Sequence, residues 1–437
     1  MYPLTPVRVY ALERAQDDPA CARRLERMLG ALGVRPADVV CITEANLPEV
    51  VADLQQAWPP TNVPAGQTRS FARALVFTTM DLSHQRRDLR PLLQRCPEGT
   101  SLGTLEAIFG QMTTAIDQHP HQRDRIENCV CWPTINFGTM VGCPHGCLYC
   151  RHGRADTFIA IALNLEEYMA RVVAPMIEFH PWNRVFRMIL GGADLIAFEP
   201  EYGLFDLFTR TLAAYEGRYG HFHTTSSNVD WIADLPHRDR LVGVWSTTCE
   251  AVARDIEPGA GSAMDRIEAG RKCQEMGLSV RYKFKPVIPV RNWREEYAWI
   301  IEQALRRSRP DSIGFCLYIW NTFESLSQQM DLDLLDPECV EAARAAADTM
   351  KGARTGPFPH SVRAEVYRHL IREVRRWDKD VPLYLSTETR EMWDELKDEL
   401  GQDPRAYICA CSSVAVPGRR LALSRGLRYS TYHPTPV

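Results

Sequence analysis

The sequence predicts an incomplete (β/α)6 barrel of the TIM type, with a small N-terminal α/β domain and a helical C-terminal extension. Three observations predict this fold: six strand-to-helix alternations after about residue 135, a globular composition, and a cysteine-rich loop after the first of those strands. Such alternation favours parallel strands joined by right-handed crossovers, and the active sites of barrels lie at the carboxyl ends of the strands. An open doubly wound sheet would satisfy the same periodicity.

The expected barrel strands are short apolar runs, and amphipathic stretches separate them. The strands are residues 135–141, 185–190, 221–225, 241–246, 279–287 and 312–317. The helices are residues 165–179, 202–215, 263–276 and 293–307, and the third crossover is short.

The flanking segments complete a four-part division: an N-terminal α/β domain (1–80), a connecting insertion (81–130), the barrel (131–320) and a C-terminal extension (321–437). Strands are expected at 7–10, 39–42 and 74–77, and helices at 21–32, 102–116 and 361–377. The last helix carries five arginines. They indicate a solvated helix face or, alternatively, a surface for an anionic substrate or nucleic acid.

Composition narrows the class of protein. Hydrophobic residues make up 45% of the 437 residues, and the net charge is −4, which gives no overall electrostatic case for nucleic acid. No leader is visible, and no apolar run reaches the roughly 18 residues of a membrane span, so a cytoplasmic protein is expected. In a reducing compartment, the 14 cysteines indicate metal or redox chemistry, or buried thiols, rather than disulfides.

The most informative segment is Gly142-Cys-Pro-His-Gly-Cys-Leu-Tyr-Cys150. Its three cysteines, Cys143, Cys147 and Cys150, suit a [4Fe–4S] cluster that leaves one iron open, because full cysteinyl ligation uses four. The open iron can bind S-adenosylmethionine (SAM). The alternative is a structural zinc site, for which the candidate fourth ligands are His145, His152, Cys129 and Cys131.

This spacing, with an aromatic residue before the third cysteine, resembles the signature of the radical SAM superfamily. The resemblance implies a [4Fe–4S] cluster, SAM and an external reductant such as flavodoxin or ferredoxin. It also implies that Tyr149 contacts the adenine through its backbone. Ile189-Leu-Gly-Gly-Ala-Asp194 is similar to the glycine-rich element of the superfamily, so Gly191 and Gly192 are expected near the SAM amino group. Ser226 and Ser246 are carried over as further SAM contacts.

One branch of the superfamily, the spore photoproduct lyases, resembles the chain over most of its length. The similar segments are 7–15, 74–77, 142–150, 223–230, 245–267, 285–297 and 383–393. Three positions depart from that branch. Its hydrogen-donor cysteine falls at Gly191, a lysine of its third strand is replaced by Thr225, and a tyrosine after the third cysteine is replaced by Arg151.

Other residues are candidates for catalysis. Lys283 and Lys285 alternate along the fifth barrel strand, where two buried lysines need an anion such as a substrate or the SAM carboxylate. Cys249 and Tyr282 are candidate hydrogen or proton carriers, with core packing as the alternative. Cys409 and Cys411 form a redox pair, ligate an auxiliary cluster together with Cys129 and Cys131, or are structural thiols.

The expected activity is reductive SAM cleavage that modifies a small molecule in a specialised biosynthetic pathway. The missing donor cysteine and the mildly acidic chain favour that substrate class. Three alternatives remain: repair of a nucleic-acid lesion as in the spore photoproduct lyases, transfer of the aminocarboxypropyl group of SAM, and a zinc-binding protein without catalysis.

Overall fold

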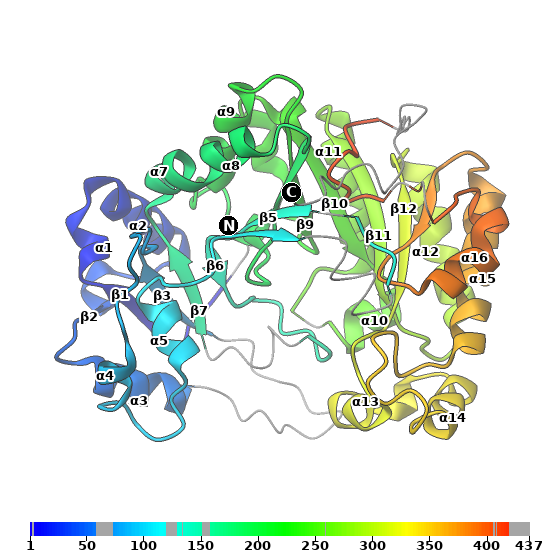
Figure 1. The fold of residues 1–437 in the computed structure, drawn as a ribbon, viewed down its shortest axis with the longest axis horizontal. Helices are drawn as coiled ribbons and strands as arrows, with labels where there is room; N and C mark the ends of the chain where they lie inside the picture. The colour runs from blue at the N-terminus through cyan, green and yellow to red at the C-terminus, as the bar shows by residue number, and fades with distance from the viewer. Residues whose placement is uncertain are drawn as a thin grey trace, which may run out of the picture.

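Two sheets stand side by side in the computed structural model (Figure 1). The structure describes residues 1, 4–57, 73–118, 129–132, 134–150, 158–257, 259–404, 407 and 409–418. Arg151 and His152, named above as a departure and as a candidate zinc ligand, lie outside the described residues.

The first sheet, at the left in Figure 1, contains the three expected N-terminal strands. Its strand order is β2 (Val40–Ile42), β1 (Val9–Leu12), β3 (Ala74–Thr78), β7 (Phe158–Ala162) and β6 (Met140–Val141). All pairs are parallel except β6 with β7. Since β6 and β7 flank the cysteine loop, both ends of that loop are anchored in the first sheet rather than in the predicted barrel.

The larger sheet has the order β13 (Leu383–Leu385), β12 (Ile313–Leu317), β11 (Ser279–Val287), β10 (Leu241–Thr247), β9 (Tyr219–Thr224), β8 (Val185–Met188), β5 (Thr134–Phe137) and β4 (Ala115–Gln118). Every pair is parallel except β4 with β5. Six parallel strands lie where they were predicted, except that the strand expected at 135–141 ends at Phe137, and its last two residues form β6 of the first sheet. The two end strands do not pair with each other, so the described sheet is open and does not close into a barrel.

Helices cover both sheets. They are α1 (Arg14–Asp17), α2 (Pro19–Leu32), α3 (Leu47–Ala57), α4 (Arg90–Leu93), α5 (Leu102–Ile108), α7 (Leu165–Tyr168), α8 (Ala174–Phe179), α9 (Leu204–Ala213), α10 (Glu250–Asp255), α11 (Ala263–Glu275), α12 (Trp293–Arg307), α13 (Phe323–Gln329), α14 (Pro337–Ala345), α15 (His360–Trp377) and α16 (Arg390–Leu400). A π-helical turn, Met169–Val173, joins α7 to α8. The described helices include none long and apolar enough to cross a membrane.

Two expectations outside the six-strand array need correction. The helix expected at 102–116 ends at Ile108, because Gly110 adopts φ +68°, and a Cβ there would lie 1.9 Å from the Thr79 carbonyl oxygen. The extension is not only helical, since β13 adds a strand to the large sheet. Three apolar residues are too short a run for periodicity to identify.

The arginines of α15 are largely satisfied within the fold. Arg363 forms a buried ion pair with Glu388, with 3.1 Å between Nε and Oε2. Arg368 pairs with Glu395 and Glu399 of α16. These contacts favour a structural role for the arginine-rich face over an anion-binding one.

A buried carboxyl at the start of α9 makes the stability of the fold depend on pH. Glu199 accepts hydrogen bonds from the backbone N–H groups of Gly203, Leu204 and Phe205, yet burial raises its pKa from 4.5 to about 7. Between these two values the folded protein keeps a proton that the unfolded chain has lost. The free energy of unfolding should therefore fall by roughly 3 kcal/mol as the pH rises from about 4.5 to about 7, and then level off.

Urea unfolding at a series of pH values tests this expectation. The Glu199→Gln variant keeps an acceptor at the helix start but cannot ionise, so its stability should not show that fall. An equal slope in the variant and the parent would assign the pH dependence to other groups.

Candidate active site

The cysteine loop is held tightly between β6 and β7. At its start Gly142 adopts φ +90°, and a Cβ there would lie 2.6 Å from the Phe158 carbonyl oxygen. Farther along, the Leu148 N–H donates to the Ile256 carbonyl (3.0 Å), and the Cys150 N–H donates to the Cys147 carbonyl (3.0 Å). The loop is therefore fixed to the first sheet at its ends and to the segment after α10 in its middle.

The three thiols of this loop lie within electrostatic range of one another. Burial, followed by the charges of Asp194 and Cys150, raises the pKa of Cys143 to about 12. Burial, Glu257 and the other two thiols raise the pKa of Cys147 well above its usual value. A bound metal would remove this penalty, because thiolates are the ligating form and binding releases their protons.

The donor set fits an iron–sulfur cluster, because three soft thiolates converge from one short loop. Within the described ranges no group of three or more His, Cys, Asp or Glu side chains is already gathered to hold an ion.

His145 connects the cysteine loop to the edge of the large sheet. Its Nε2 lies 2.9 Å from Asp194 Oδ2, and its Nδ1 lies 2.9 Å from the Gly259 carbonyl oxygen. Asp194 also accepts hydrogen bonds from the Thr224 hydroxyl (2.7 Å) and the Thr225 N–H (2.9 Å). Both ring nitrogens of His145 are thus engaged, which disfavours this residue as the fourth zinc ligand.

A buried ion pair holds the other side of the loop. The Tyr149 hydroxyl donates to Glu257 Oε1 (2.5 Å), and Glu257 Oε2 lies 2.6 Å from a guanidinium nitrogen of Arg266. Arg266 in turn donates to the Ser246 carbonyl at the end of β10 (3.2 Å). Glu257 and Arg266 are 1% and 0% exposed, so a fully buried ion pair fixes the position of the Tyr149 hydroxyl.

The predicted SAM contacts gather at the same edge of the large sheet, because they follow the carboxyl ends of parallel strands. Gly191 and Gly192 follow β8 with φ +87° and +73°. Ser226 follows β9 and is buried, and Ser246 lies near the end of β10, where its hydroxyl is 2.8 Å from His223 Nε2. Their individual contacts with SAM stay predictions.

The predicted catalytic residues separate into two pairs. Lys283 and Lys285 alternate with residues that pack on the helices, so they lie on the opposite face of β11, here called the inner face. Tyr282 instead contacts Ser308 (3.0 Å between hydroxyl oxygens) in the layer between β11 and α12. Cys249 is fully buried at the start of α10. For Tyr282 and Cys249 the structure favours the core-packing alternative.

Two residues that the sequence analysis did not select lie at or near the site. His223 is half-buried on β9, and loss of solvent together with Lys283, Arg187 and Lys285 lowers its pKa well below the usual value, so the ring is neutral. Trp320 follows β12 with φ +66° and is 45% exposed, and Lys285 Nζ lies 4.6 Å from the centroid of its ring. An aromatic residue just beyond a strand end was the signal that could have identified Trp320.

The position of the missing donor cysteine cannot accept a side chain in this fold. A Cβ at Gly191 would lie 2.0 Å from the Met140 carbonyl oxygen, in addition to the cost of its positive φ. We expect Gly191→Ala to lower the free energy of unfolding by more than about 2 kcal/mol.

Gly352 provides the matched control, since its φ is +79° and nothing lies within 4 Å of an added Cβ. Gly352→Ala should cost about 1 kcal/mol, the conformational term alone. Equal losses of stability in the two variants, measured by urea unfolding, would contradict the close approach at Gly191.

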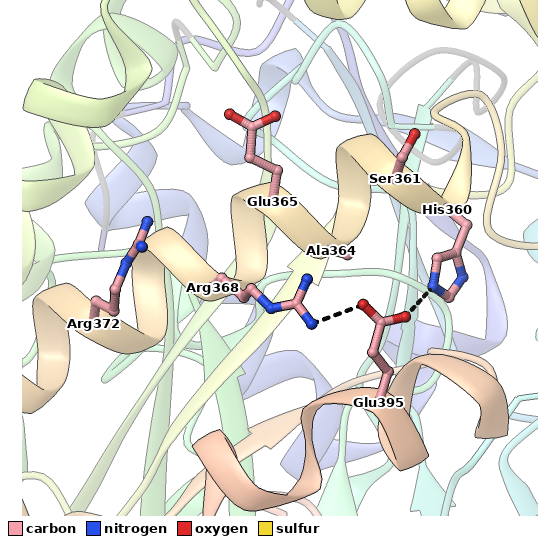
Figure 2. A pocket seen from close by; sticks show the side chains of 7 residues that line it. All are labelled: His360, Ser361, Ala364, Glu365, Arg368, Arg372 and Glu395. Carbon is pink, nitrogen blue, oxygen red and sulfur yellow. Dashed lines mark hydrogen bonds and ion pairs between the residues drawn. The ribbon is translucent and has the colours of Figure 1, made fainter.

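A surface pocket of about 440 Å³ lies elsewhere, between α15 and α16 (Figure 2). Figure 2 shows Glu395 reaching across from α16 to His360 and Arg368, at 2.6 and 2.8 Å. None of its lining residues belongs to the cysteine loop or to the strand ends described above. Because it lies away from the cysteine loop and the strand ends, it is not the candidate active site.

Comparison with known proteins finds similarity to the spore photoproduct lyases. The family model described as "Spore photoproduct lyase" matches residues 133–323. A curated spore photoproduct lyase from Clostridium acetobutylicum is 22% identical over 189 residues, which cover 42% of this chain. The chain spans only about half (55%) of the length of that relative.

Solved structures of spore photoproduct lyase share the fold. A cysteine variant with dinucleoside spore photoproduct and a second variant with bound AdoMet and the same dinucleoside both match with a TM-score of 0.59. They are 16% and 15% identical, and each match covers 88% of this chain and 98% of the other.

The cysteine loop, the strand-end glycines and the parallel sheet, together with these matches, support a radical SAM protein. Within that superfamily the chain is similar to the spore photoproduct lyase-like branch. The matches support the predictions of a radical SAM enzyme class and of a [4Fe–4S] cluster and SAM as cofactors over the zinc-binding alternative without catalysis. The expected small-molecule biosynthetic substrate finds no support, and the matches favour the nucleic-acid alternative.

Proposed function

We propose that this chain reductively cleaves SAM to repair or modify a pyrimidine lesion of the spore photoproduct type. The observation that carries the substrate class is the exposed Trp320 ring beside Lys285 at the strand ends. An aromatic face with an adjacent cation suits a nucleotide, because bases stack on the ring and phosphates attract the cation. The dinucleoside photoproduct bound by the structural relatives belongs to this chemical class.

Each part of the site has a role in this proposal. Cys143, Cys147 and Cys150 hold the cluster, which with SAM supplies the 5′-deoxyadenosyl radical. The strand-end glycines and Ser246 orient SAM, and the ion pair behind Tyr149 keeps water from the loop. Because residue 191 is glycine, the final hydrogen atom comes from a group other than a cysteine at that position. Flavodoxin or ferredoxin is the proposed electron donor.

The test uses anaerobically reconstituted protein with SAM, dithionite and dinucleoside spore photoproduct, and mass spectrometry reads the products. We expect 5′-deoxyadenosine and a repaired or modified dinucleoside, and neither product should increase with the undamaged dinucleoside. Formation of 5′-deoxyadenosine that is indifferent to the lesion, with the dinucleoside unchanged, would remove the substrate assignment. Methylthioadenosine in its place would indicate aminocarboxypropyl transfer.

Removing the stacking ring should weaken substrate binding. Because stacking on an aromatic side chain contributes about 1–3 kcal/mol per base, Trp320→Ala should raise the Kd for the dinucleoside by about tenfold or more. Trp377 is the matched control: it is 42% exposed, and the Arg306 guanidinium lies 4.6 Å from its ring centroid, but it ends α15. Equal effects of Trp320→Ala and Trp377→Ala in equilibrium binding would contradict the proposed role.

A further inference from the structure

Four cysteines outside the cluster loop come from two distant Cys-x-Cys segments. Cys129 and Cys131 precede β5, while Cys409 and Cys411 follow α16. Trp132 brings the segments together, because its indole N–H donates to the Tyr407 carbonyl (2.9 Å). The segments that carry the cysteines thus lie side by side, although the chain between them forms most of the large sheet.

The thiols of Cys409 and Cys411 lie close to each other and away from water. The Sγ atoms of Cys409 and Cys411 are 3.8 Å apart, and both residues are buried. Burial and the neighbouring Cys411 raise the pKa of Cys409. The charge of Cys131 also contributes to this rise, so Cys131 lies within electrostatic range of Cys409. Cys129 is also buried, and in an extended segment residues two apart face the same side.

The surroundings of these thiols are strongly cationic. Lys283 Nζ lies 3.9 Å from Cys411 Sγ, and Arg281 donates to the Ala410 carbonyl (2.7 Å). Lys283 and Arg281 are 4% and 0% exposed. The negative charge of Asp311 stabilises the charged form of Arg281. For Lys283, the hydrogen-bond partner described is the thiol of Cys411. Buried cations of this kind require a nearby negative charge.

A second observation in the same region points to a ligand. His221 of β9 is fully buried, and neither of its ring nitrogens has a hydrogen-bond partner among the described residues. Burial and the charges of Arg187, His223, Arg281 and Lys283 lower its pKa, so the ring is neutral and keeps a free lone pair. An unpaired buried imidazole beside these cations is costly unless a further group occupies the region.

We propose that Cys129, Cys131, Cys409 and Cys411 hold a second metal centre on the inner face of the large sheet. Soft thiolates select zinc or an iron–sulfur cluster, and a four-thiolate centre of either kind carries a net negative charge. That charge balances Lys283 and Arg281, and His221 is available to ligate or to contact the centre. Among the described residues these thiols are not gathered tightly enough to hold a single ion, so metal binding would draw them together.

Metal and sulfide analysis of a variant without the cluster loop cysteines tests this proposal. The triple variant Cys143→Ala, Cys147→Ala, Cys150→Ala should retain either about four irons with sulfide or about one zinc per chain. Adding Cys409→Ser and Cys411→Ser should remove that metal. Adding Cys273→Ser and Cys339→Ser, two buried cysteines elsewhere, should leave it in place. A triple variant that binds neither metal would overturn the proposal.

The unmodified protein provides a second measurement if the variants fold poorly. With two clusters, the reduced protein should give two paramagnetic signals, and SAM should perturb only the one from the cluster with an open iron. With zinc, X-ray absorption should show sulfur ligands at about 2.3 Å. Iron for one cluster only, without zinc, would contradict the second centre, and SAM cleavage would still test the first.

Discussion

Replacing Cys147 by alanine is expected to abolish reductive SAM cleavage. Cys147 is the most buried of the three cluster cysteines, so no neighbouring water can readily replace its sulfur as a ligand. It also lies within electrostatic range of both other thiols. Loss of an outer-shell partner alone costs about 10- to 100-fold, so loss of a ligand should exceed a hundredfold. Production of 5′-deoxyadenosine and the visible absorbance of the cluster are the measurements.

Cys339→Ala is the matched control for this prediction. Cys339 lies in α14, and it and Cys147 are both 8% exposed, so the two substitutions remove thiols of equal burial. The control should keep its iron content and its SAM cleavage. Comparable losses of activity in both variants would assign the effect of Cys147→Ala to folding rather than to cluster ligation.

Breaking the buried pair behind Tyr149 is expected to cause the largest loss of stability. Arg266→Met leaves the Glu257 carboxylate buried without its cation, which should cost about 3–5 kcal/mol. The charge of Glu257 raises the pKa of Cys147 and so disfavours the thiolate that ligates the cluster. Without Arg266 the cluster should therefore be lost more readily as well. Urea unfolding measures the first effect, and iron retention under a chelator measures the second.

Two further variants interpret that result. Adding Glu257→Gln to Arg266→Met removes the unpaired charge and still offers Tyr149 an acceptor, so much of the lost stability should return. Arg171→Met breaks an exposed pair with Glu167 on the helices after β7 and should change stability by less than about 1 kcal/mol. If Arg266→Met costs no more than Arg171→Met, the buried pair does not hold the loop.

The sequence alone determined the strand array and the cluster loop. Alternation of apolar runs and amphipathic stretches is a local property, so the six parallel strands from β5 to β12 could be predicted without coordinates. The spacing of Cys143, Cys147 and Cys150 is also local, because one short loop supplies all three thiols. The choice between core packing and catalysis for Tyr282 required the face of β11 on which it lies.

The tertiary structure decided which distant segments meet. Strand β6 has two residues and β13 has three, too few for any periodicity, and their places in the sheets follow from the strands beside them. The contact of Trp132 with Tyr407, and of Lys285 with Trp320, joins residues that share no local pattern. Local patterns report the conformation of a segment, whereas the partners of a side chain depend on long-range packing that no short window of sequence contains.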